Sequence, residues 1–198
     1  MNEDRLSKQI EFLVEIDKLK TVFRNVFLVA DPNRRENSAE HSWHTAMMAL
    51  ILEEYAQNQV DSSRLVKMML IHDVIEVDAG DTNIYDKQAS MDKAKREQRG
   101  AERIFSLLAH DQRQELFELW EEYEKGITPE AKFARALDRL IPLIHNYYTQ
   151  GKRWKEDGIT YEMALPVYQK IQENCPALWE FALSMINECV SKGYLPEH

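Results

Sequence analysis

In the stretch Leu70-Ile71-His72-Asp73-Val74-Ile75-Glu76, a histidine and an aspartate stand side by side within an apolar run. Leu65, Met68, Met69 and His72 follow the i, i+3, i+4, i+7 spacing of one buried helix face. Such a face normally excludes ionisable groups, because an unpaired buried charge is costly. A metal ion would satisfy both side chains, since it pairs with the carboxylate and binds the imidazole lone pair.

The surrounding residues predict how this stretch is presented. Helix-forming residues and apolar spacing indicate a helix from about residue 63 to residue 77. Glu76 would then lie one turn beyond His72, on the same side. Gly80 allows the chain to turn after the helix and places Asp81 on a loop.

Length and composition predict one acidic globular domain, residues 1–198. The chain is 44% hydrophobic and 30% charged, which suits a globular protein with a substantial core. Its 34 acidic residues outnumber 25 basic ones, for a net charge of −9. This balance argues against nucleic acid or an anionic membrane as the main partner, because both require a basic surface.

Cysteine usage predicts a reducing compartment. Cys175 and Cys189 are the two cysteines, too few for a disulfide framework, and we expect both to be buried as small apolar residues. The first residues do not resemble a signal peptide, and the longest apolar run is too short to span a bilayer. We therefore expect a cytoplasmic protein.

The periodicity along the chain predicts an all-α fold with about six to eight helices. An extended apolar piece covers residues 26–30, but no segment shows a convincing alternating strand pattern. The last two helices, within residues 160–198, carry only packing signals. The expected helices span residues 4–20, 39–58, 63–77, 92–109, about 112–125, 129–150, 161–173 and 176–192.

Three more candidates for a polar site fall on two other helices. Ser38 is the expected N-cap of the helix from residue 39, with His41 in its first turn and His44 one turn later. Asp138 stands in the apolar stripe of the helix from residue 129, four residues before Pro142. A buried ion pair with an arginine or lysine would explain Asp138, and a metal ligand is the interpretation we favour.

A second doublet, His110-Asp111, is expected to have no part in such a site. It follows the end of one helix, and Asp111 with Gln114 fits a capping box for the next.

The remaining candidates form a mixed nitrogen and oxygen ligand set from three helices: His41 or His44, with His72, Asp73 and Asp138. Such a set suits Mn²⁺, Fe²⁺, Co²⁺, Ni²⁺ or Zn²⁺ better than a metal selected by thiolates. Four ligands on a metal that prefers six leave room for water and a substrate oxygen.

The order of these residues resembles the motif of the HD-domain metal-dependent phosphohydrolases. The similarity covers about residues 5–150 and is closest to the branch related to bacterial 5′-deoxynucleotidases. It is carried by Glu36-Asn37-Ser38-Ala39-Glu40-His41-Ser42, by His72-Asp73-Val74-Ile75-Glu76-Val77 with Gly80-Asp81, and by Leu119-Trp120-Glu121-Glu122-Tyr123-Glu124 followed by Glu130-Ala131-Lys132-Phe133.

The resemblance implies roles for individual residues. His41 rather than His44 would be the first ligand, joined by His72, Asp73 and Asp138, with one divalent ion: Mn, Co, Fe, Ni, Zn or Mg. Glu76 and Asp81 would serve the chemistry, and Arg24 would contact the substrate phosphate. Arg35, in the basic pair Arg34-Arg35, is a second candidate phosphate contact. The resemblance also implies that the chain forms a homodimer.

The implied activity is release of phosphate from (deoxy)nucleoside 5′-monophosphates by a metal-bound hydroxide. Glu76, partly desolvated, could protonate the leaving oxygen while Asp81 orients water or a sugar hydroxyl, or the two could exchange roles. Asn25 stands where the bacterial enzymes carry a tryptophan against the sugar, so the preference for a deoxy sugar stays open. Two alternatives are an HD-type hydrolase of cyclic nucleotides or guanosine polyphosphates, and a metal-bound helical binding module without turnover.

Overall fold

The computed structural model of the chain describes residues 3–86 and 88–198, and these are predominantly helical. Eight of the α-helices within these ranges are ten residues or longer, which agrees with the expected all-α fold. The elements are α1 (Glu3–Ile16), η1 (Asp17–Thr21), β1 (Phe23–Phe27), β2 (Arg35–Asn37), α2 (Ser38–Leu52), η2 (Glu53–Tyr55), α3 (Ser62–Ile71), α4 (Glu76–Ala79), α5 (Lys93–Phe105), α6 (His110–Lys125), α7 (Pro129–Tyr148), α8 (Lys152–Asp157), α9 (Tyr161–Asn174) and α10 (Pro176–Ser191).

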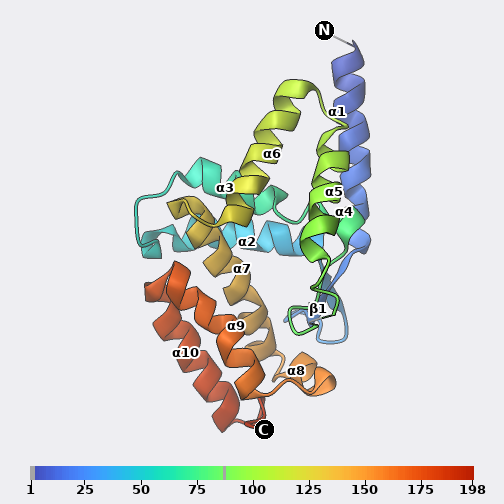
Figure 1. The fold of residues 1–198 in the computed structure, drawn as a ribbon. Coiled ribbons are helices and arrows are strands. Elements are labelled where there is room, and N and C mark those ends of the chain that lie inside the picture. Colours follow the sequence, from blue (N-terminus) through green and yellow to red (C-terminus); the bar gives the residue numbers. More distant parts are fainter. Residues whose placement is uncertain (1–2, 87) are drawn as a thin grey trace.

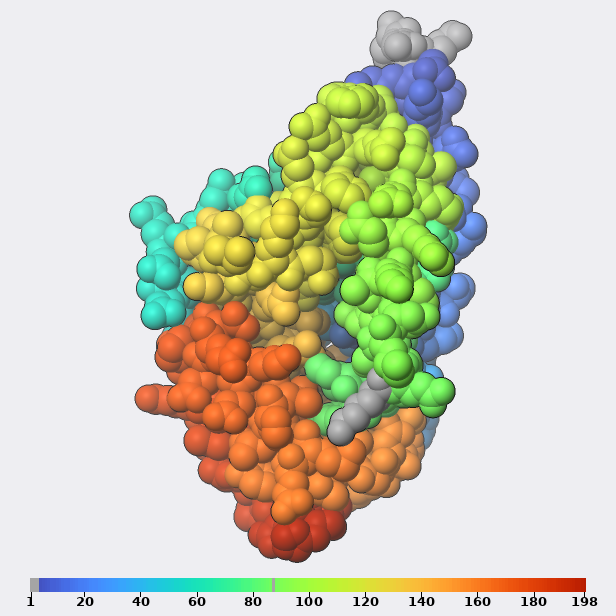
Figure 2. Space-filling model, in the orientation of Figure 1, coloured from blue at the N-terminus to red at the C-terminus, as the bar shows by residue number. Residues whose placement is uncertain are grey.

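Helix α7 runs through the middle of the molecule and contacts α2, α3, α6, α9 and α10 (Figure 1). Helices α2 and α3 pack against each other and against α7, while α9 and α10 pack against α7 beside them. At the other end α1, α5 and α6 lie together. Figure 2 shows α5 and α6 over the upper part of one face and α9 and α10 over the lower part.

Two hydrophobic clusters stabilise this arrangement. The larger cluster joins α2, α3, α6, α7, α9 and α10 and includes Met68, Met69 and Leu137. The smaller one joins η1, α1, α4, α5 and α6 and includes Val74 and Ile75. The chain passes from one cluster to the other between Met69 and Val74, so the segment with His72 and Asp73 lies at their junction.

Helix α3 ends earlier than the sequence predicts. We expected a continuous helix from residue 63 to 77, but α3 ends at Ile71, and His72 is its C-cap. From there the backbone tightens to three-residue hydrogen bonds, with Val74 N donating to Ile71 O and Glu76 N donating to Asp73 O. The bend has a physical reason, because the apolar residues before and after it enter different clusters.

A small antiparallel sheet was not expected from the sequence. β1 pairs with β2, with Phe23 opposite Asn37 and Phe27 opposite Arg35. Strands of five and three residues are too short to show a convincing alternation. Within the described residues, no helix has both the length and the apolar character needed to cross a membrane.

Candidate metal centre

The first turn of α2 carries His41 and is fixed by a capping box. The Asn37 side chain accepts a hydrogen bond from Glu40 N, and the Glu40 side chain accepts one from Asn37 N. The expected N-cap, Ser38, is therefore one residue off. Because Asn37 caps the helix, the Ser38 hydroxyl is free to donate to Glu76 Oε2 at 2.6 Å.

The bend after α3 orients His72 toward the site. His72 Nδ1 lies 2.8 Å from Met69 O and must donate to it, so Nε2 carries the lone pair. This Nε2 is buried and has no hydrogen-bond partner among the described residues. It lies 3.3 Å from Asp73 Oδ1 and 3.9 Å from Asp138 Oδ1. An unpaired imidazole nitrogen facing two carboxylates is what a metal ligand requires.

His41 meets the same group from the opposite helix. Its Nε2 lies 3.0 Å from Asp138 Oδ1 and 3.8 Å from Asp73 Oδ2, and its Nδ1 lies 3.3 Å from Glu36 Oε2. Burial and Arg24 lower the pKa of His41, but the carboxylates of Asp138, Glu36 and Asp73 outweigh them and raise it to about 9. Glu36 also fixes the ring so that Nε2 faces the centre.

Asp138 reaches the centre from α7 and is held on both oxygens. Oδ1 faces His41, and Oδ2 accepts a hydrogen bond of 3.0 Å from the Tyr123 hydroxyl. Burial alone would raise the pKa of Asp138, but the His41 hydrogen bond and the charge of Arg24 lower it well below its ordinary value. The sequence analysis missed Tyr123 and Glu36 as polar partners, because Tyr123 fits the apolar stripe of α6.

Arg24 on β1 places a positive charge among these carboxylates. Its Nη1 lies 2.6 Å from Asp73 Oδ2, and its Nη2 lies 3.6 Å from Asp138 Oδ1. Glu76 Oε1 and Asp81 Oδ1 are each 3.8 Å from Nη1. The acids therefore share one central cation, whose side chain is only 13% exposed.

Glu76 and Asp81 border the centre on the side of the loop after α4. Gly80 has a φ of 70°, which allows the sharp turn expected there. Burial raises the pKa of Glu76 well above its ordinary value, with a further contribution from Asp73, while Arg24 opposes the shift. A buried carboxylic acid whose pKa is raised in this way is a potential proton donor.

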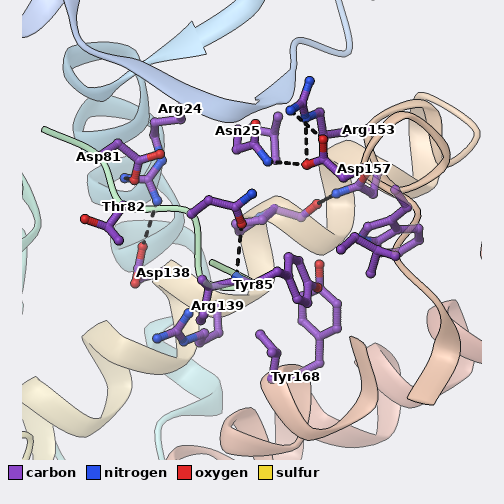
Figure 3. A pocket seen from close by; sticks show the side chains of 18 residues that line it. Arg24, Asn25, Asp81, Thr82, Tyr85, Asp138, Arg139, Arg153, Asp157 and Tyr168 are labelled. Carbon is purple, nitrogen blue, oxygen red and sulfur yellow. Dashed lines mark hydrogen bonds and ion pairs between the residues drawn. The ribbon is translucent and has the colours of Figure 1, made fainter. Parts of the chain in front are cut away.

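Two adjoining cavities open onto these residues. The first, about 180 Å³, contains the metal-ligand candidates His72, Asp73 and Asp138 together with basic side chains. Those basic residues are Arg24, Lys93, Arg135 and Arg139. The second, about 100 Å³, has Tyr85, Trp154 and Tyr168 in its wall. Arg24, Asp81 and Asp138 line both, and Figure 3 shows them at one end of the second cavity.

The second cavity also has a polar wall formed by Asn25 and Asp157. Asn25 Nδ2 donates to Asp157 Oδ2 at 2.5 Å, and Arg153 Nε donates to the same oxygen at 3.0 Å (Figure 3). Asn25 thus lines the same cavity as the aromatic side chains of Tyr85, Trp154 and Tyr168.

Two candidates from the sequence lie outside this constellation. Arg35 is absent from both cavity walls, and its guanidinium donates to the carbonyls of Arg24 and Phe23 at 2.7 and 3.2 Å. The structure therefore places it as a support for β1. His44 is half-buried, and its ring lies 5.8 Å from that of His145. Burial lowers the pKa of both histidines, which keeps them neutral at pH 7.

The second His-Asp doublet does not cap α6. That helix begins at His110 after Ala109, and no side chain caps it. Asp111 instead accepts two hydrogen bonds of 2.7 Å from Arg5. The prediction of a capping box is wrong, and the doublet lies on the exposed outer surface, away from the centre.

A divalent cation fits the residues that converge here. Ligand atoms of His41, His72 and Asp73 lie within 4.8 Å of one another, and Asp138 adds a carboxylate. The partnerless His72 nitrogen and the position of Arg24 both point to a site built for positive charge. Two imidazoles and two carboxylates suit a first-row transition metal and can leave positions open for water and substrate.

Fold and site together define a helical protein with a buried cluster of histidines and aspartates that suits a metal ion. Residues 16–179 match the HD domain family, and the chain belongs to this family. A structure of a "Predicted metal-dependent phosphohydrolase" from Magnetospirillum magnetotacticum MS-1 is 47% identical, with a TM-score of 0.92 over 98% of this chain and 97% of that one.

Curated relatives carry a more specific name. The "5′-deoxynucleotidase HDDC2" of Homo sapiens is 34% identical over 130 residues, which is 66% of this chain and 62% of the human protein. The protein of the same name from Danio rerio is 31% identical over 72% of this chain and 70% of its own length. The match thus spans less than two thirds of the human relative.

Proposed function

We propose that this chain is a metal-dependent phosphomonoester hydrolase that releases phosphate from ribo- or deoxyribonucleoside 5′-monophosphates. The observation that carries the proposal is the unpaired Nε2 of His72, which faces Asp73 and Asp138 at the wall of a cavity that four basic side chains also line. The names of the relatives, a metal-dependent phosphohydrolase and 5′-deoxynucleotidases, support it.

The two cavities suit the two ends of a nucleotide. The first cavity is lined by four basic and six acidic side chains. With a divalent ion bound to offset the carboxylates, Arg24, Lys93, Arg135 and Arg139 would be the partners for phosphate oxygens. The aromatic residues of the second cavity suit a nucleobase, and the pair Asn25–Asp157 offers hydrogen bonds to sugar hydroxyls. Because Arg24 lines both cavities, the scissile bond would lie beside it.

His41, His72, Asp73 and Asp138 would hold the divalent ion, for which Mn, Co, Fe, Ni, Zn and Mg are the candidates. When bound, such an ion lowers the pKa of water toward neutrality and neutralises charge on phosphoryl oxygens. Arg24 would turn from the carboxylates to the phosphate and stabilise charge that develops on it. Glu76 would donate a proton to the leaving 5′-oxygen, and Asp81 would orient water or a sugar hydroxyl.

We further propose a homodimer, with the exposed apolar stripe of α2 as the interface. Trp43, Leu50 and Ile51 are 62%, 49% and 67% exposed and follow the i, i+7, i+8 spacing of one helix face. Several large apolar side chains exposed on one helix face are typical of a protein–protein interface. Light scattering should give twice the chain mass, and Ile51→Asp should give a monomer. A monomeric wild type would refute this part of the proposal.

We also propose a cell compartment and a domain organisation for the chain. Cys175 and Cys189 are buried free thiols, which supports the cytoplasm. The net charge of −9 supports small anionic substrates at a local basic cavity over nucleic acid. We propose that residues 1–198 act as one HD domain.

Phosphate release from a panel of 5′-ribo- and 5′-deoxyribonucleotides, with added Mn²⁺ or Co²⁺, tests the activity. Asp73→Ala and Glu76→Ala should abolish release. Asp111→Ala is the matched control, since it alters the other His-Asp doublet, and it should behave as wild type. If wild type with bound metal releases no phosphate from any 5′-nucleotide, and chromatography shows no product from cyclic nucleotides or guanosine polyphosphates, the chain is a binding module.

A further inference from the structure

A second cluster of ligand-type side chains lies behind His41, on the side opposite the metal centre. His41 Nε2 faces Asp138, whereas its Nδ1 faces Glu36 Oε2 at 3.3 Å. Glu36 belongs in turn to a group with His44 and His145, in which one ligand atom from each residue lies within 4.8 Å of the others. The same spacing describes His41, His72 and Asp73 in the metal centre.

The cluster contains a buried nitrogen without a partner. His145 is 2% exposed, and its Nδ1 has no hydrogen-bond partner among residues 3–86 and 88–198. This atom lies 3.8 Å from Glu36 Oε2, which is too far for a hydrogen bond, and the carboxylate is the nearby acidic group. A buried polar atom in this position needs an explanation, and a bound cation supplies one.

Glu36 has capacity for a further positive partner. Its side chain is 1% exposed, and the positive or potentially positive groups near it are the His41 ring at 3.3 Å, Arg24 Nε at 3.8 Å and His145 Nδ1 at 3.8 Å. A carboxylate offers about four lone-pair positions on two oxygens, so it can accept from His41 and still bind a cation. His44 closes the group from α2 and is half-buried, which gives the cluster a route to solvent.

We propose that Glu36, His44 and His145 bind a second transition-metal dication, such as Zn²⁺, through two imidazoles and one carboxylate. Ligands at tetrahedral Zn²⁺ lie about 3.4 Å apart, so the three atoms need to move together by little more than about 1 Å. Three protein ligands leave one position for water, in the direction of the half-exposed His44. The proposal concerns metal binding alone and does not depend on phosphate release.

The number of bound ions provides the test. Untagged full-length chain is stripped with a chelator, titrated with Zn²⁺ by calorimetry, and desalted for elemental analysis. Wild type should bind two equivalents. Asp73→Ala should keep one, at the second site, and His44→Ala should also keep one, at the first. His110→Ala is the control for a histidine outside both clusters and should bind two.

Other results would overturn the proposal. A wild type that binds one equivalent and an Asp73→Ala variant that binds none would show that Glu36, His44 and His145 only orient His41. A second equivalent that survives both His44→Ala and His145→Ala would belong elsewhere. If His145→Ala fails to fold by circular dichroism, the half-exposed His44→Ala decides, together with an anomalous difference peak between the three side chains in zinc-loaded wild-type crystals.

Discussion

Arg24 Nη1 lies 2.6 Å from Asp73 Oδ2, so an arginine occupies the middle of the carboxylates that would hold a metal. Four further acids lie within 3.8 Å of the same guanidinium: Glu36, Glu76, Asp81 and Asp138. The metal and Arg24 would compete for Asp73, and we expect Arg24 to turn from Asp73 toward the substrate phosphate when the metal is bound. This arrangement separates metal binding from catalysis in a testable way.

Arg24→Ala should lower phosphate release by about 10²- to 10³-fold, the usual cost of losing one group that stabilises a developing negative charge. Metal affinity should stay the same or increase, because a competing positive charge is removed. Arg34→Ala is the control, since Arg34 pairs with the exposed Glu40. Loss of metal together with activity would show instead that Arg24 supports the ligands.

Metal affinity should depend on pH through His41. Its pKa of about 9 means that the metal-free site holds a proton on this ring at neutral pH, which a metal ion must displace. Affinity should therefore rise by about tenfold per pH unit below the pKa, if His41 is the one group that titrates, and level off near pH 9. Titration calorimetry in buffers of different ionisation enthalpy would count the released proton. Affinity that does not change between pH 6 and 8 would contradict the assigned state of His41.

Ser38→Ala should shift the alkaline limb of the pH–rate profile. The Ser38 hydroxyl donates to Glu76 Oε2 at 2.6 Å and so stabilises the carboxylate form. Removing it should raise the pKa of Glu76 further, and a proton donor with a higher pKa stays active to higher pH. The falling limb should move up in pH. An unchanged limb, with normal metal content, would argue for Asp81 as the proton donor.

Gly100→Ala should destabilise the segment that carries His72 and Asp73. A Cβ at Gly100 would lie 2.8 Å from Ile75 O, and backbone cannot yield there as a flexible side chain could. Forcing this contact between α5 and the bend should lower the free energy of unfolding by about 1–3 kcal/mol. Arg99→Ala, at the exposed neighbouring position on α5, should change it little. Denaturant unfolding measures both variants, and equal stability would show that α5 can move aside.

Sequence patterns predicted most of the helices, because apolar spacing reports burial. They also singled out ligand candidates that the fold brings together, because an acid on a buried face is conspicuous. Asp138 and His72 were found in this way. The bend at His72 was missed, because the pattern shows that a residue is buried but not which of two hydrophobic clusters buries it. The sequence also indicated Ser38 as the N-cap of α2, whereas Asn37 is the N-cap. The hydrogen bond from the Ser38 hydroxyl to Glu76 was therefore not expected.

Residues that act by orienting others were beyond sequence reasoning. Tyr123 fits an apolar stripe, and only the packing of α6 on α7 brings its hydroxyl to Asp138. Arg35 resembles a free phosphate contact in the sequence, but the pairing of β1 with β2 brings it onto the carbonyls of Phe23 and Arg24. A tyrosine or acid inside a predicted apolar face is the signal that could have prompted a search for such partners.

Restoring activity with metal tests the central claim most directly. The chain is stripped with a chelator, and phosphate release from its best 5′-monophosphate is measured as Mn²⁺ or Co²⁺ is added back. Release should be absent without metal and should return with a midpoint that matches the dissociation constant of the site abolished by Asp73→Ala. Release that is indifferent to chelation, or metal that binds at this site without any release, would contradict a metal-dependent hydrolase.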